Sequence, residues 1–254
     1  MKRFYYLIFL LCILPNHNVV LADDLRIAAA SNLRFVMADL VDDFSRRVGG
    51  AEISVTYGAS GNLTNQIRHG APYDIFFAAD AKYLVQVEEM QLLRGEIVFY
   101  ADNYLALFAR LGSRLTLDAE LEGLGKLIEN RQLNKFAIAN PKHAPLGRHA
   151  MAMLKERALW ETVQPHLLTA ENASQAMQFA LTGQVDGAMV PYSLASQPKI
   201  ASQGHVLKLS ASVRQAVAIL MRAPDRAEDF IDYLGSRSAI QILEAHGFSA
   251  IANQ

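Results

Sequence analysis

Two short segments constrain this chain most, because each places a small hydroxyl residue where an apolar strand pattern changes to a helical one. They are residues 28–33 (AAASNL) and 57–63 (YGASGNL), which contain Ser31 and Ser60. The start of a helix carries unpaired backbone N–H groups and a partial positive charge. Two such starts directed at one point form a site for a small oxyanion without any cationic side chain. The alternative is that both serines are ordinary helix caps.

The N-terminal sequence predicts a secretory signal peptide over residues 1–22. Lys2 and Arg3 form a basic start, an apolar run follows over 4–14, and the small residue Ala22 marks a cleavage site. The apolar run is shorter than the roughly 20 residues that span a bilayer, so we expect cleavage after Ala22 rather than a membrane anchor. The mature protein is therefore expected in the periplasm.

Composition limits the chemistry that the mature chain can carry. The single cysteine, Cys12, lies in the predicted leader, so we expect no disulfide, cysteine nucleophile or cysteine metal ligand. Loss of Lys2 and Arg3 changes the formal charge from −1 to −3, which disfavours nucleic acid and anionic membranes as partners. No glycine-rich phosphate loop and no histidine pair at metal-ligand spacing is present, so we expect neither a cofactor nor a free metal cation.

The alternation of apolar and amphipathic runs predicts an α/β fold. Strand-like runs at 25–30, 53–57 and 74–79 are each followed by a helical pattern. This order predicts a parallel sheet with helices on both faces. A second set of such elements follows, with strands at 136–140, 167–170 and 187–190 and helices at 147–158 and 174–182.

Two long apolar stretches, 97–109 and 213–221, have the length to cross between two lobes. Two lobes joined by two crossing segments imply a cleft and a hinge, where a ligand commonly binds. We therefore assign lobe I to residues 23–102 and 213–254 and lobe II to residues 103–212, each a mostly parallel sheet flanked by helices.

Six segments resemble those of periplasmic molybdate-binding proteins, the soluble receptors of ABC importers that have the type II periplasmic-binding-protein fold. The segments are AAASNL (28–33), GASGNLTNQI (58–67), GAPYDIFFAAD (70–80), ANPKHAPLGRHA (139–150), ENASQAM (171–177) and GAMVPYS (187–193). The resemblance covers nearly all of the predicted mature chain. It implies a monomeric receptor without catalytic activity, which binds molybdate and tungstate and delivers them to a membrane permease.

In that family the oxyanion is held by hydrogen bonds alone, so that molybdenum is bound as molybdate and not as a cation. Carried over to this sequence, the resemblance implies two hydroxyl donors, Ser31 and Ser60. It also implies backbone N–H donors at Ser31, Asn32, Ser60, Leu146 and Ala173. These groups are all donors, and a buried O–H on the ligand would face them at a cost of about 1–3 kcal/mol. The set therefore favours a fully ionised dianion over hydrogen phosphate.

One branch of the family adds a tyrosine hydroxyl at the end of a later strand. The aligned position here is Pro191, and Tyr192 lies one residue further on. A shift of one residue on a strand turns the side chain to the opposite face. Tyr192 therefore stays an additional candidate contact, outside the main set.

Charged residues near these motifs have simpler explanations. Asp80 is expected to cap the helix that begins near Lys82. Lys142 and Arg148 flank the P-x-x-A-P-x-G segment and are expected to be solvated surface charges rather than groups that steer anions.

Other functions remain open on the sequence alone. A receptor for another tetrahedral oxyanion such as sulfate would need the same donors and a different cavity size. An enzyme on the same fold would need a base beside Ser31 or Ser60, and the sequence shows no such partner. A sensor domain that signals to a partner protein is the third alternative.

Overall fold

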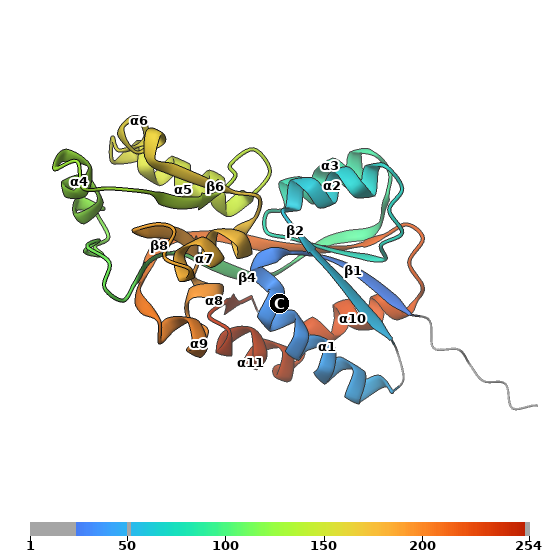
Figure 1. Ribbon diagram of the computed structural model, residues 1–254. Helices are drawn as coiled ribbons and strands as arrows, with labels where there is room; N and C mark the ends of the chain where they lie inside the picture. Colours follow the sequence, from blue (N-terminus) through green and yellow to red (C-terminus); the bar gives the residue numbers. More distant parts are fainter. Residues whose placement is uncertain (1–23, 50–51, 252–254) are drawn as a thin grey trace, which may run out of the picture.

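The computed structural model describes residues 24–49 and 52–251. The predicted signal peptide and Cys12 lie outside these described residues. Figure 1 shows two α/β lobes joined by two long strands, β4 (Leu93–Arg110) and β8 (Gly204–Leu220). Over the described ranges, no helix has the length and apolar character that a membrane span requires.

Lobe I has three parallel strands, with β1 in the middle and β8 antiparallel beside β3. Three helices cover one face of this sheet and two cover the other (Figure 1). The strands are β1 (Leu25–Ala30), β2 (Ile53–Gly58) and β3 (Ile75–Ala78). One face carries α1 (Arg34–Val48), α10 (Arg226–Leu234) and α11 (Arg237–Ala245), and the other carries α2 (Ser60–Arg68) and α3 (Lys82–Glu89).

Lobe II repeats this plan with β5 between β6 and β7 in parallel, and β4 antiparallel beside β7. Its strands are β5 (Phe136–Ala139), β6 (Leu167–Ala170) and β7 (Gly187–Pro191). One face is covered by α4 (Glu122–Glu129), α5 (Pro145–Glu156) and α6 (Trp160–Val163). The other is covered by α7 (Ala173–Leu181), α8 (Tyr192–Ala195) and α9 (Pro198–Ala201). Short segments complete the fold: the 3₁₀ turns η1 (Ser31–Leu33) and η2 (Gln164–His166), and β9 (Ser249–Ala250), which pairs with β4.

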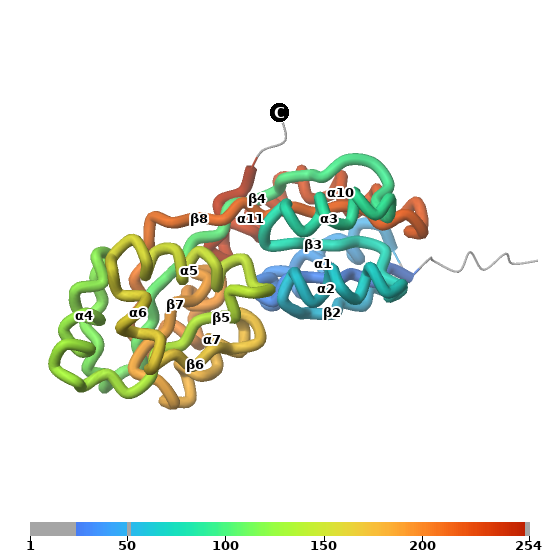
Figure 2. The backbone as a smooth tube through the Cα atoms, turned by 90° about the horizontal axis from the view of Figure 1, so that it is seen from above, coloured from blue at the N-terminus to red at the C-terminus, as the bar shows by residue number. Residues whose placement is uncertain are grey.

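A single sheet runs through both lobes, in the order β2-β1-β3-β8-β4-β7-β5-β6. The tube view shows β4 and β8 crossing together from one lobe to the other (Figure 2). The predicted two-lobed α/β class is confirmed, although β8 begins earlier than the predicted segment 213–221. The first half of β8 alternates buried or partly buried apolar residues with exposed polar ones, so it lacks the continuous apolar run that marks a strand buried on both faces.

Along each crossing strand, the side chains pack first in the hydrophobic core of one lobe and then in that of the other. On β4, Ala101 packs in the core of lobe I and Leu105 in that of lobe II. On β8, Val213 packs in lobe II and Ala216 in lobe I. Each crossing strand therefore contributes side chains to both cores, and the segment between them is the connection about which the lobes can move.

Within lobe I, Asp43 on α1 joins α10 and α11. Its carboxylate accepts hydrogen bonds from Tyr233, at 2.9 Å, and from Ser238, and it pairs with Arg47 at 3.0 Å. The hydrogen bond from Ser238, helped by those from Tyr233 and Arg47, lowers the pKa of Asp43 to about 2. The folded state therefore favours the ionised carboxylate.

We predict that Asp43→Asn lowers the melting temperature near neutral pH and that this deficit shrinks in acid. A depressed folded-state pKa adds stability above the unfolded value of about 4, and that stability is lost as pH falls through the folded value. Melting curves of both proteins between about pH 6 and about pH 2 measure the effect. Asp42→Asn, at the exposed neighbouring position, is the matched control. Equal melting temperatures for the two variants near pH 6 would contradict the prediction.

Candidate functional site

A small cavity lies between the lobes, and it brings together all five residues of the main predicted set. Lobe I contributes Ala30, Ser31, Asn32, Gly58, Ala59, Ser60 and Ala79, and lobe II contributes Ala144, Pro145, Leu146 and Ala173. The volume of this cavity that is open to the centre of a water molecule is about 10 Å³. That volume is about what one water molecule needs, so in this arrangement the cavity excludes sugars, amino acids and nucleotides.

Backbone N–H groups at four helix starts line this cavity. Ser31 and Asn32 open η1, Ser60 opens α2, Leu146 is the second residue of α5, and Ala173 opens α7. N–H groups at these positions have no acceptor within their own helix. In the part of the chain that the structure describes, none of them has another backbone acceptor. A buried donor without a partner costs about 1–3 kcal/mol, so an anion that accepts from several of them would be bound favourably.

The two serines are not helix caps. The capping positions are held by Ala30 and Ala59, and each serine is the first residue inside its helix. The hydroxyl oxygen of Ser60 accepts the Ala79 N–H at 3.1 Å, which leaves the hydroxyl proton free to be donated. Both side chains are buried, at 3 % exposure for Ser31 and 0 % for Ser60. The alternative of ordinary caps is therefore wrong.

The electrostatics of the cavity come from backbone rather than from side chains. Its lining residues carry no charged group and no side-chain carboxylate. The N-terminal ends of α2, α5 and α7, and of α1 through η1, direct partial positive charge towards it. Within the described residues, no group of three or more His, Cys, Asp or Glu side chains is placed to hold a metal ion.

A buried polar network, which the sequence reasoning missed, holds Asn32 in place. The Asn32 side chain donates to Gln215 Oε1 on β8 at 2.9 Å. Its backbone carbonyl accepts from Ser193 Oγ at 3.1 Å, and that hydroxyl accepts from Asn103 Nδ2 on β4 at 2.9 Å. Gln215 also donates to the carbonyl of Ala79 at 3.3 Å. The only sequence signal for this network was a polar residue within each apolar crossing segment.

Tyr192, the additional candidate, does not line the cavity. Strand β7 ends at Pro191, and Tyr192 begins helix α8, with its ring centroid 5.1 Å from Lys208 Nζ. The tyrosine ring lies beside Gly247, where a Cβ would be 3.0 Å from Tyr192 Cδ1, and Tyr192 is not among the residues that line the cavity. The structure thus does not support a contact between Tyr192 and a ligand in this cavity.

Asp80 and Arg148 lie just outside the cavity. Asp80 satisfies a helix-start N–H as predicted, since its Oδ1 accepts the Lys82 N–H at 2.9 Å, although the capping position of α3 itself is Ala81. The prediction that Arg148 is a solvated surface charge is wrong: its side chain is only 22 % exposed and pairs with Asp80 at 2.7 Å. Sequence spacing could not show this pair, because the two residues belong to different lobes.

The lobes also touch directly through α2 and α7. The Gly61 N–H donates to the His143 carbonyl at 3.0 Å, and Ser174 Oγ donates to the Ser31 carbonyl at 2.8 Å. Gly61 allows this approach, because a Cβ at that position would lie 2.8 Å from the Cβ of His143. The structure therefore has its lobes closed on the cavity.

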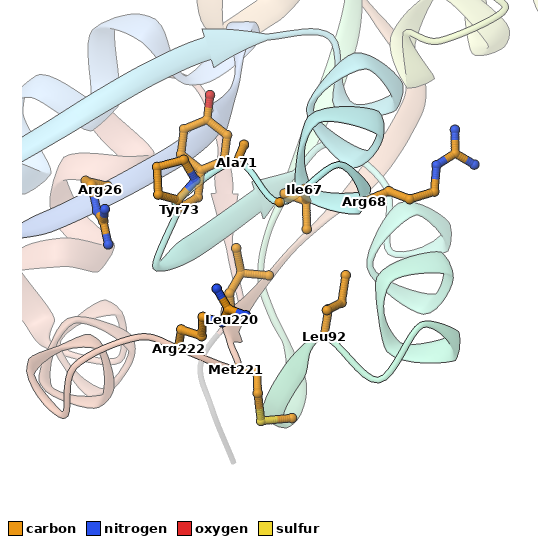
Figure 3. A pocket seen from close by; sticks show the side chains of 11 residues that line it. Arg26, Ile67, Arg68, Ala71, Tyr73, Leu92, Leu220, Met221 and Arg222 are labelled. Atoms are coloured by element: carbon orange, nitrogen blue, oxygen red, sulfur yellow. The ribbon is translucent and has the colours of Figure 1, made fainter.

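A much larger pocket lies on the outer surface of lobe I, and it contains none of the predicted residues. The volume open to the centre of a water molecule is about 530 Å³ there. Its wall includes Arg26, Arg68, Tyr73, Met221 and Arg222 (Figure 3). Arg26 is paired with the buried Asp74 at 3.0 Å, so its charge is neutralised by a neighbour. This pocket is far larger than a single small oxyanion needs, and its wall contains none of the helix starts that meet at the cavity between the lobes.

Comparisons with known proteins agree with this architecture. Residues 25–249 match the model of a family described as bacterial extracellular solute-binding protein. The molybdate-binding protein ModA of Azotobacter vinelandii is 26 % identical over 234 residues, which cover 89 % of this chain and 90 % of that protein. ModA of Rhodobacter capsulatus is 28 % identical over 225 residues, which cover 87 % and 86 %.

Solved structures share the fold. The periplasmic molybdate-binding protein of Azotobacter vinelandii superposes with a TM-score of 0.79 at 24 % identity, covering 91 % of this chain and 100 % of that one. The sulfate-binding protein SubI of Mycobacterium tuberculosis gives a TM-score of 0.76 at 12 % identity, covering 90 % and 87 %. Receptors named for two different oxyanions thus have this fold, so the fold alone does not select the anion.

We predict that Gly61→Ala weakens binding of a tetrahedral oxyanion by about tenfold or more, because the new methyl group obstructs lobe closure. Its contact is with the opposite lobe, so the melting temperature of the free protein should change little. Calorimetric titration with molybdate or sulfate measures the affinity. Gly125→Ala on α4 is the control, since its Cβ would meet only Leu159 at 3.6 Å. Equal affinities for the two variants would show that closure does not need Gly61.

Proposed function

The chain belongs to the family of bacterial extracellular solute-binding proteins, and we propose that it is the molybdate receptor of an ABC importer. Tungstate, which is nearly the same size, would be a second ligand. The observation that carries this proposal is the cavity in which hydroxyl and N–H donors from both lobes converge without a charged side chain. We propose that the protein delivers the ion to the membrane permease as a monomer.

Binding would connect the two lobes through the anion. Ser31, Asn32 and Ser60 would donate from lobe I, and Leu146 and Ala173 from lobe II. A ligand that contacts both lobes binds the closed arrangement better than an open one, and so shifts the population towards closure. Release to a permease then requires that the lobes separate.

A lining without any carboxylate supports selection by protonation state. Hydrogen phosphate carries an O–H, and no side chain lining the cavity is a carboxylate that could accept its proton. The cost of an unmatched buried O–H, about 1–3 kcal/mol, corresponds to a loss of about 5- to 150-fold in affinity. Sulfate has no such proton, so cavity size must separate it from molybdate, and the names of the relatives favour molybdate.

The lining also supports binding rather than catalysis. It contains no imidazole, carboxylate, amine or thiol that could act as a base beside Ser31 or Ser60. The proposed periplasmic location rests on the predicted leader and on the extracellular character of the family.

We predict that molybdate and tungstate raise the melting temperature of the mature protein, while phosphate does not. A ligand at about 100 times its Kd stabilises the folded state by about 2.7 kcal/mol, which is roughly 5–10 °C for a chain of this size. Melting curves with molybdate, tungstate, sulfate and phosphate, each in excess, measure this. A shift with sulfate alone would reassign the ligand, and no shift with any of the four would contradict an oxyanion receptor.

We further predict that the double variant Ser31→Ala, Ser60→Ala folds normally and loses at least about 100-fold in affinity. Each hydroxyl that donates to a charged ligand contributes about 1.5–3 kcal/mol, and the two losses combine. Titration calorimetry measures the affinity, and circular dichroism checks the fold. Ser202→Ala, on an exposed turn, serves as the control. An unchanged affinity of the double variant would disprove the assignment of the site.

A further inference from the structure

Arg148 bridges the two lobes beside the cavity. It lies in the first turn of α5 in lobe II, and both of its partners belong to lobe I. Nη2 is 2.7 Å from Asp80 Oδ2, and Nη1 donates to the Tyr83 hydroxyl at 2.5 Å. The guanidinium carbon also lies 5.2 Å from the centroid of the Tyr83 ring. One side chain therefore makes three kinds of contact across the gap between lobes.

Arg148 and Asp80, the two ends of this ion pair, each lie close in sequence to a residue that positions a proposed hydrogen-bond donor of the cavity. Arg148 follows Leu146 by two residues, so it is part of the turn that presents the Leu146 N–H. Asp80 directly follows Ala79, whose N–H orients the Ser60 hydroxyl. A contact between Arg148 and Asp80 thus sets the distance between a donor of lobe II and a donor of lobe I.

Neither member of the pair lines the cavity, so the pair acts on a ligand only through the position of the lobes. Their side chains are 22 % and 23 % exposed, which reduces screening of their attraction by solvent. Two further basic groups face this region, Lys82 and His149. Burial lowers the pKa of each, and the charge of Arg148 lowers it further. Asp80 is thus the acidic partner that compensates the charge of Arg148.

We propose that Arg148 is a positioning residue for oxyanion binding. It stabilises the closed arrangement, in which the Leu146 N–H and the Ser60 hydroxyl face the same ion. This inference rests on the proposed function of the cavity. Since the bridge forms as the lobes meet, and breaks when they separate, it acts mainly on the rate of ligand release.

The test is Arg148→Met, which keeps an unbranched side chain of similar length and removes the charge and the donors. We expect molybdate to dissociate about tenfold faster in stopped-flow measurements, with an association rate within about twofold of the wild type. The melting temperature of the free protein should be close to that of the wild type. Arg157→Met is the matched control, because Arg157 is 23 % exposed and pairs with Glu120 inside lobe II at 3.4 Å. Its dissociation rate should not change.

A double-mutant cycle separates positioning from a general effect on structure. Asp80→Asn keeps the oxygen that accepts the Lys82 N–H, so it should speed dissociation about as much as Arg148→Met, and the double variant should be no worse than either single one. Arg148→Lys should release molybdate at a rate between those of the wild type and Arg148→Met, because lysine keeps the positive charge. Additive effects in the cycle, or an unchanged dissociation rate in Arg148→Met, would overturn the inference.

The wild-type protein distinguishes the two ways in which this can fail. If the wild type binds molybdate or another oxyanion and Arg148→Met releases it at the same rate, only the role of Arg148 is wrong. If the wild type binds none of the four tested oxyanions, the proposed function and the role of Arg148 are both wrong.

Discussion

The antiparallel pairing of β4 with β8 is the interaction on which the rest of this structure depends. It carries one sheet through both lobes and contributes side chains to both hydrophobic cores. It also holds Asn103 and Gln215, whose buried amides bond to Ser193 and Asn32. A buried amide without a partner is costly, so these bonds fix the first donor segment relative to the two crossing strands. The same connection that allows the lobes to move therefore also positions one wall of the cavity.

The cavity relies on backbone geometry where many anion sites rely on cationic side chains. Four helical segments begin at its wall, and each brings N–H groups that its own helix leaves unpaired. Small residues make this convergence possible. Gly61 allows contact with His143, and a Cβ at Gly147 would lie 2.1 Å from the carbonyl oxygen of Ala139. The charged residues Arg148 and Asp80 pair with each other and do not line the cavity, and we propose that they act on lobe closure.

Much of the fold and the two serine motifs could be predicted from local sequence signals. The strand over residues 25–30 and the serine motifs at 31 and 60 lie where the structure has them, and the helices predicted at 147–158 and 174–182 begin two residues and one residue earlier, at Pro145 and Ala173. These features depend on hydrophobic period and on residues close in sequence. The errors concern contacts between distant segments. The sequence predicts Arg148 to be a solvated charge, because its partner, Asp80, is 68 residues away and in the other lobe. The first half of β8 alternates apolar and polar residues over 207–212, a strand pattern that the predicted segment 213–221 leaves out.

The sequence by itself determined the alternation of strands and helices and the two crossing segments, because these depend on neighbours along the chain. The five residues proposed to donate to an oxyanion came from its resemblance to periplasmic molybdate-binding proteins. Only the tertiary structure decided that the serines lie inside their helices, that Tyr192 does not line the cavity, and that Asn32 and Ala79 are held by Gln215. It also decided how small the cavity is. The reason is physical: cavity size and contacts between lobes depend on how far apart the two separately packed lobes lie. No local sequence pattern determines the distance between the lobes.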